Sequence, residues 1–124
     1  MKLTPEDIAR RRPVWAALSD LYLDTNHALS YDFIAGILAN SGYESAEIEQ
    51  IIRDEVGPVL YTNLLQVAGD WAGFPAEWVE REITHYLEQP APLRAATQIA
   101  SMIVTKDILN TDWPRLRALA WGQN

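Results

Sequence analysis

Two short segments place a carboxylate three residues before an imidazole: Asp24 precedes His27, and Glu82 precedes His85. On a helix this spacing puts both side chains on one face, as in the carboxylate-bridged di-iron bundles that hold their metals with Glu-x-x-His pairs. Such a centre needs two helical pairs and two further glutamates, whereas the pattern places Asp24 and His27 at a helix end. Exposed carboxylates beside surface histidines are the simpler interpretation, and a small metal-dependent or acid–base enzyme using these four residues is the alternative.

Other kinds of reactive site are not indicated. The chain has no cysteine, which excludes a thiol nucleophile and a cysteine-type zinc site. It has no Gly-x-Ser-x-Gly elbow, and the glycines at 69 and 73 lack the lysine of a phosphate-binding loop. Paired carboxylates remain open, because such pairs meet only in three dimensions. We therefore expect no cofactor and no metal, and we name no catalytic residue.

The charge is unevenly distributed along the chain. The net charge is −7, and residues 13–80 contain eleven acidic residues and a single basic one, Arg53. Such a region repels phosphate backbones and anionic lipid and attracts basic partners, although it could equally serve only to keep the protein soluble. The basic run Arg10–Arg12 is too short for a DNA-recognition helix, and we expect it to pair with the acidic region. The charge predicts no nucleic-acid partner and no membrane.

One local detail favours a role for the acidic region. Asp20 and Asp24 lie four residues apart near the end of a predicted helix, where like charges repel each other and oppose the helix dipole. A cation on a partner would explain both carboxylates, and so would ion pairs with Arg10–Arg12.

Apolar residues recur at helical spacing along the whole chain, and strand-like alternation is nearly absent. Thr4, Pro5 and Asp7 predict the start of the first helix, and Pro13 predicts either a kink or a second start. Further helix boundaries are expected at Ser30, Gly42, Ser45, the Gly57-Pro58 break, Pro75 and Thr111 or Asp112.

The segment 93–109 is apolar on more than one face, which predicts a central, buried helix. The connections are short, so successive helices should pack as neighbours. The sequence therefore predicts an all-α fold: one domain spanning residues 1–124, a compact orthogonal or bundle-like array of about six to seven short helices. No apolar stretch is long enough to span a membrane, and the N-terminus becomes polar at once, so we expect a cytoplasmic protein.

Several segments in the order found here are similar to a family of small bacterial all-helical proteins of unknown function. The resemblance covers about residues 13–83 and is carried by the segments 17–25, 40–43, 55–60, 63–65 and 68–74. It implies a bacterial, cytosolic, stand-alone protein. It transfers no activity and no binding residue.

Three functions follow from these observations. The first is an acidic helical protein-binding module, an immunity protein or antitoxin that occludes a basic bacterial toxin. The second is the enzyme described above, and the third is a structural or regulatory subunit whose acidic face is merely solubilising. The oligomeric state stays open. For the first function, the expected partner-binding residues are Asp20, Asp24, Asp32, Glu47, Asp54 and Asp70.

Overall fold

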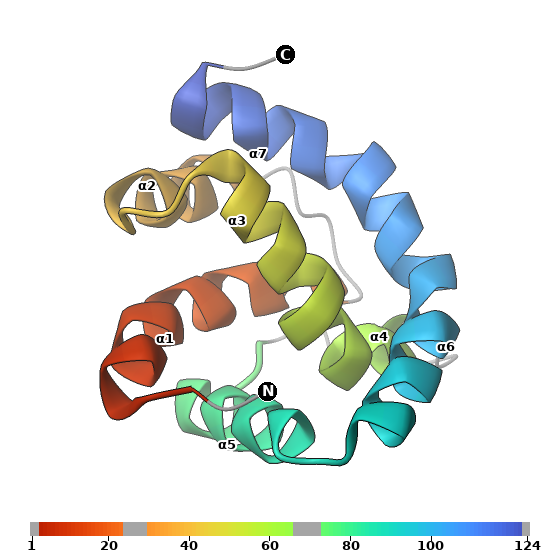
Figure 1. Ribbon diagram of the computed structural model, residues 1–124. Coiled ribbons are helices and arrows are strands. Elements are labelled where there is room, and N and C mark those ends of the chain that lie inside the picture. The colour runs from red at the N-terminus through yellow and green to blue at the C-terminus, as the bar shows by residue number, and fades with distance from the viewer. Residues whose placement is uncertain (1–2, 24–29, 66–72, 123–124) are drawn as a thin grey trace.

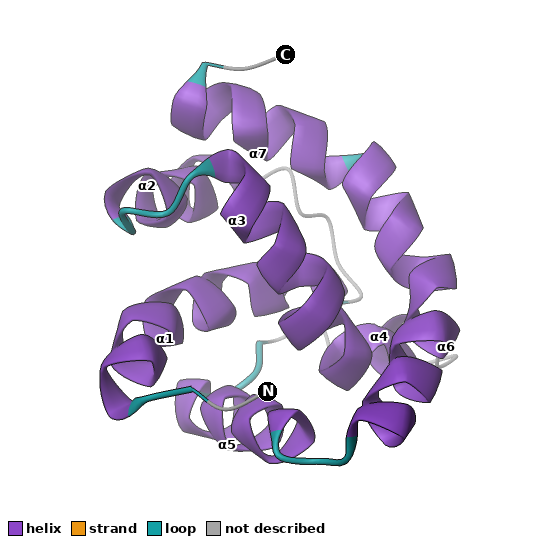
Figure 2. Cartoon of the chain, viewed as in Figure 1, coloured by secondary structure: helices purple, strands orange, loops and turns teal. Residues whose placement is uncertain are grey.

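The computed structural model of the protein describes residues 3–23, 30–65 and 73–122, and these ranges contain helices and no strand (Figure 2). The all-α prediction is therefore confirmed. In chain order the elements are α1 (Pro5–Ser19), the 3₁₀ turn η1 (Asp20–Tyr22), α2 (Tyr31–Asn40), α3 (Ser45–Ile51), the π-helical turn η3 (Ile52–Val56), α4 (Gly57–Leu65), α5 (Ala76–Leu87), α6 (Ala91–Asn110) and α7 (Asp112–Trp121).

The helices pack as an orthogonal array around one core (Figure 1). Helix α1 packs against α2 and α5, while α4 packs against α6 and α2 against α7. Helices α6 and α7, which run from cyan to blue, follow one another along one side of the molecule (Figure 1). The largest fully buried side chains come from most of these elements and include Trp15, Tyr22, Ile48, Ile83 and Trp113. No helix in the described ranges has the length and apolar character needed to cross a bilayer.

Helix α1 begins as its sequence predicts. The backbone N–H of Thr4 donates to Asp7 Oδ2 at 3.0 Å, and the N–H of Asp7 donates to Thr4 Oγ1 at 3.1 Å. This reciprocal pair forms a capping box, and the hydrogen bond from the Thr4 backbone lowers the pKa of Asp7. Pro13 lies inside α1, which continues to Ser19, so it does not start a second helix. Ser30 is the N-cap residue of α2, as predicted, although its side chain forms no capping hydrogen bond. The cap of α3 differs from the prediction: Glu44 is its N-cap, and Ser45 is its first helical residue.

The chain stays helical through Gly57-Pro58, so the predicted break is wrong. Proline lacks an N–H, and its ring clashes with the carbonyl four residues earlier. Here the turn before Pro58 is widened: the N–H of Gly57 donates to the carbonyl of Ile52, five residues back. This π-turn, η3, lets the helix accommodate the proline and continue into α4.

Gly57 also allows α4 and α6 to approach closely. A Cβ at this position would overlap Thr105 Oγ1 of α6 and would lie 3.0 Å from the hydroxyl of Tyr22. Those two groups form a buried hydrogen bond of 2.9 Å. The two helices can therefore lie this close only because residue 57 has no side chain.

The prediction of a central, buried helix over residues 93–109 is wrong for α6. Ile99 is 74% exposed and Ile103 81% exposed, whereas Val104 and Ile108 are buried. Only one face of α6 contacts the core, and the isoleucines on its other face lie at the surface. An apolar residue at the surface needs no special explanation, since folded proteins expose much apolar area.

Candidate functional site

The structure describes four of the six predicted partner-binding acids, and Asp24 and Asp70 lie outside the described residues. Asp20 opens η1, and Asp32 lies in the first turn of α2. Glu47 lies in the first turn of α3, and Asp54 lies in η3. Glu47 and Asp54 line one pocket, whereas Asp32 lines a different one.

The pocket that contains Glu47 and Asp54 lies along α3 and η3 and has a volume of about 210 Å³. We call it the α3 pocket. Positions 47, 50, 51 and 54 are three and four residues apart, which places them on one helical face. Helix α1 adds a wall from the other side. The pocket is lined by Arg11, Tyr43, Glu47, Gln50, Ile51, Asp54 and Glu55.

Glu55 is the buried carboxylate of the α3 pocket, with only 3% of its surface exposed. Arg11 Nε donates to Glu55 Oε1 at 3.1 Å, and the indole N–H of Trp15 donates to the same oxygen at 2.7 Å. Burial raises the pKa of Glu55, while the charge of Arg11 and both hydrogen bonds oppose that rise. Arg11 and Glu55 therefore compensate each other's charge inside the molecule.

Tyr43 forms the end of the pocket next to α1. The guanidinium carbon of Arg10 lies 4.1 Å from the centre of the tyrosine ring, and that of Arg11 lies 5.6 Å away. These are cation–π distances. Gly42, at φ +82°, leaves room for Arg10, because a Cβ there would lie 3.2 Å from its Nη2.

The hydroxyl of Tyr43 is an unusual group, because it is buried within the protein. The residue is only 6% exposed, and its hydroxyl has no hydrogen-bond partner among the residues that the structure describes. Buried hydroxyls are nearly always paired, so an unpaired one requires an explanation.

The carboxylates of Glu47 and Asp54 each accept a hydrogen bond from within the protein. Glu47 Oε1 accepts the backbone N–H of Glu44 at 3.0 Å, and Asp54 Oδ1 accepts Gln98 Nε2 from α6. A carboxylate has about four acceptor sites, so each of them can accept more hydrogen bonds. The positive charge of Arg11 is compensated by its ion pair with Glu55. The carboxylates of Glu47 and Asp54 therefore leave an excess of negative charge in the pocket. This arrangement can bind a cation.

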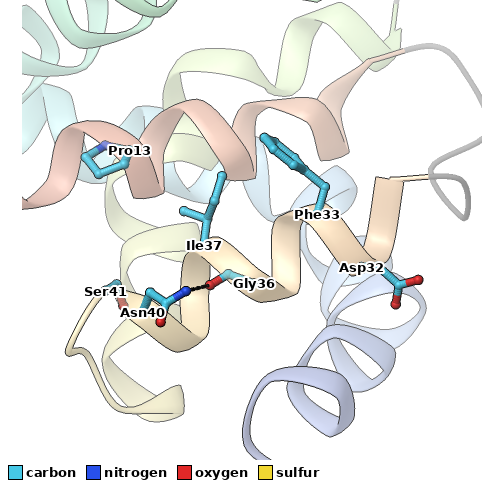
Figure 3. A pocket seen from close by; sticks show the side chains of 7 residues that line it. All are labelled: Pro13, Asp32, Phe33, Gly36, Ile37, Asn40 and Ser41. Atoms are coloured by element: carbon cyan, nitrogen blue, oxygen red, sulfur yellow. Dashed lines mark hydrogen bonds between the residues drawn. The ribbon is translucent and has the colours of Figure 1, made fainter.

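A second hollow, of about 510 Å³, lies between α1 and α2 (Figure 3). Phe33 and Ile37 point from α2 toward α1, where Pro13 faces them, and Phe33 remains 66% exposed. Asp32 points away from α1. This hollow is mainly apolar and does not bring Asp32 near the other predicted acids.

The residues of the enzyme alternative are not gathered into a site within the described ranges. Glu82 and His85 lie on α5, where Glu82 is 3.7 Å from Arg81 and His85 is exposed beside Glu88. Asp24 and His27 lie outside the described residues. No group of three or more metal-ligating side chains occurs among the residues that are described.

A family model described as a domain of unknown function, DUF7079, matches residues 9–119. The chain belongs to the DUF7079 family. The predicted membership of a small family of unknown function is thereby confirmed, and the match extends well beyond residues 13–83. No curated protein and no solved structure matches the chain.

Sequence reasoning missed the interior of the α3 pocket in this DUF7079 chain. Arg11, Tyr43 and Glu55 were not selected, although all three line it. One signal was available for Glu55, an acid among the apolar residues Ile51, Ile52 and Val56 just before Gly57-Pro58. The expected pairing of the Arg10–Arg12 run with the acidic region is found, as Arg11 pairs with Glu55 and Arg12 with Glu80.

Proposed function

We propose that this chain is an acidic protein-binding module of the bacterial cytoplasm, an immunity protein or antitoxin that occludes a basic toxin. The observation that carries the proposal is the position of Glu47 and Asp54, two of the predicted acids, at one pocket beside a buried carboxylate. The eleven acidic residues within residues 13–80 support it, because they create a field that attracts a basic protein.

The mechanism would be occlusion. A toxin that acts on nucleic acid presents lysine and arginine side chains to phosphate groups. Carboxylates at positions 20, 24, 32, 47, 54 and 70 would occupy those cations in place of phosphate. The opposite charges would also speed the encounter, and that effect weakens as salt is added.

Affinity capture from the native host tests this function. The bait would be the full chain, compared with a variant carrying Asp32→Asn, Glu47→Gln and Asp54→Asn. We expect the wild-type chain to retain a basic protein at low and moderate salt, the variant to lose it, and the retained protein's activity on nucleic acid to be inhibited by the wild-type chain. Recovery of no stable protein partner at either salt concentration would contradict the proposal. Equal retention by the variant would leave the acidic face with a solubilising role only.

A further inference from the structure

We propose that the exposed face of α6 binds the same face of a second copy of this chain, so that the protein forms a two-fold dimer. This inference goes beyond the proposed function and does not depend on it. Helix α6 lies along one edge of the array of helices (Figure 1). It carries three of the five large apolar side chains that are exposed in the described ranges: Leu93 is 57% exposed, Ile99 74% and Ile103 81%.

The apolar side chains of this face are continuous. Ala96 and Ala100 are exposed as well, and their spacing of three and four residues from the two isoleucines places all four on one side of the helix. Residues 95–105 contain no charged residue. A single apolar residue at a surface is ordinary, whereas a continuous apolar face is typical of an interaction site.

The shape of this face is complementary to itself. Ile99 and Ile103 are four residues apart and form a ridge, while Ala96 and Ala100 form a groove beside it. Helices commonly pack by placing such a ridge of one helix in such a groove of the other. A second copy provides a groove for this ridge and a ridge for this groove, as a two-fold interface requires.

The charge of α6 also favours a second copy. The whole chain has a net charge of −7, but α6 contains two basic residues, Arg94 and Lys106, and one acidic residue, Asp107. Two copies that meet through α6 therefore bring together segments that are not acidic. Contact through the acidic segment 13–80 would instead be opposed by repulsion between like charges.

Other partners suit this face less well. The basic protein of the proposed function would find a single carboxylate on α6, that of Asp107. A helix that lies on an anionic bilayer needs a polar face rich in lysine and arginine. Within α6, which is described along its whole length, Lys106 is the one exposed cation. A second copy is therefore the occupant that this face favours.

The size of the face sets the strength of the dimer. Helix α6 has 20 residues and is about 30 Å long, and its apolar face from Leu93 to Ile103 spans roughly half of that length. Stable interfaces bury about 800 Å² on each partner, which a face of this length does not provide. We therefore expect a weak dimer that forms at high protein concentration and dissociates on dilution.

Sedimentation equilibrium of the full chain, from roughly 1 μM to roughly 1 mM, tests the dimer. We expect a monomer at the lowest concentration and a dimer, with no larger species, at the highest. Added sodium sulfate should strengthen the dimer, because it screens the repulsion between two acidic proteins and favours apolar burial. Binding of a basic partner should weaken as salt is added, so the two associations differ in the sign of their salt dependence.

Three variants locate the contact. Ile99→Gln combined with Ile103→Gln removes the ridge and should weaken dimerisation at least about tenfold, since side chains at the centre of an interface carry most of its energy. Ala100→Leu keeps the face apolar but fills the groove, and it should weaken dimerisation several-fold. Phe33→Gln changes an apolar residue of α2 that is 66% exposed and should leave dimerisation unchanged. Circular dichroism would verify that each variant is folded.

The inference is overturned if the chain stays monomeric at every concentration and salt. It is also overturned if Ala100→Leu strengthens association, because the surface would then be merely adhesive, or if Phe33→Gln weakens it as much as the double variant. Failure of the proposed function is a separate result. A monomer that still captures a basic protein contradicts only the dimer, and a dimer that captures none contradicts only the proposed function.

Discussion

The indole N–H of Trp15 in α1 donates a hydrogen bond to Glu55 in η3, with 2.7 Å between Nε1 and Oε1. Arg11, one turn earlier in α1, donates to the same carboxylate. Two side chains of one helix therefore hold a buried acid of another element. Arg11 and Glu55 also line the α3 pocket. The contact therefore holds α1 against η3 at this pocket.

Substitution of Glu55 should change how stability depends on pH. Burial raises its pKa above the usual 4.5, against the opposing effects of Arg11 and Trp15. A carboxyl with a raised pKa contributes stability that is fully present below the unfolded pKa and is lost as pH rises through the folded pKa. We therefore expect the wild-type chain to gain stability relative to Glu55→Gln as pH falls from neutral toward 4.5.

Urea denaturation of both proteins at neutral pH and at pH 4.5 measures this difference. Glu77→Gln, an exposed position, serves as the control and should show no such trend. If the wild-type chain instead loses stability relative to Glu55→Gln on acidification, the pKa of Glu55 is lowered and not raised by folding.

Gly57→Ala should destabilise the protein by about 1–3 kcal/mol, as added atoms do in a packed core. The new Cβ would overlap Thr105 Oγ1 and force α4 away from α6. Gly36 in α2 is the matched control, since a Cβ there meets no atom within 4 Å. Gly36→Ala should stabilise by roughly 0.5–1 kcal/mol through the lower entropy of the unfolded chain. Thermal and urea unfolding of both variants would check this, and similar effects at the two positions would contradict it.

Two isoleucines of α6 should respond differently to truncation. Ile108 is 2% exposed, and Ile108→Ala should cost roughly 2–5 kcal/mol. Ile103 is 81% exposed, and Ile103→Ala should change stability by no more than about 0.5 kcal/mol. Both variants can be measured by urea denaturation of dilute samples. A large loss of stability for Ile103→Ala would mean that this face of α6 is covered in solution.

The hydroxyl of Tyr31 should lose its proton at an unusually high pH. Burial, its hydrogen bond to Asp112 and the charge of that carboxylate together raise its pKa to about 12. Asp112→Asn should lower this pKa, because it removes the charge and leaves only the effect of burial and a weaker hydrogen bond. NMR titration of the tyrosine ring carbons measures it. Asp107→Asn, on the exposed side of α6, is the control, and an unchanged pKa in Asp112→Asn would contradict the assignment.

The fold could be predicted largely because its signals are local. Helical spacing, the Thr4 and Asp7 cap and the glycine at the end of α2 each act within one or two turns, so they can be recognised without neighbours. The behaviour of Pro58 could not be predicted, because a proline either ends a helix or is accommodated by a wide turn, and packing decides between them. The exposure of Ile99 and Ile103 also depends on which face of α6 meets other helices.

The candidate site could be predicted only in part, because most of its residues are brought together by tertiary packing and not by a local pattern. The charge of Glu47 and Asp54 predicts a binding role for both, and both line one pocket because they lie on one helical face. Arg11, Tyr43 and Glu55 come from three separate elements or connections, and their meeting follows from the tertiary packing of α1 against η3. The hydroxyl of Tyr43, which is unpaired among the described residues, has no counterpart in any sequence pattern.

The proposed function requires that the carboxylates of the α3 pocket bind a basic protein. Its most direct test is the dissociation constant of the captured partner, measured for the wild-type chain, the Glu47→Gln/Asp54→Asn double variant and the Glu77→Gln control under identical salt. We predict at least tenfold weaker binding by the double variant, since loss of charged contacts at an interface costs roughly 1.4 kcal/mol or more, and binding within twofold of wild type by the control. Equal dissociation constants for all three proteins would contradict the account.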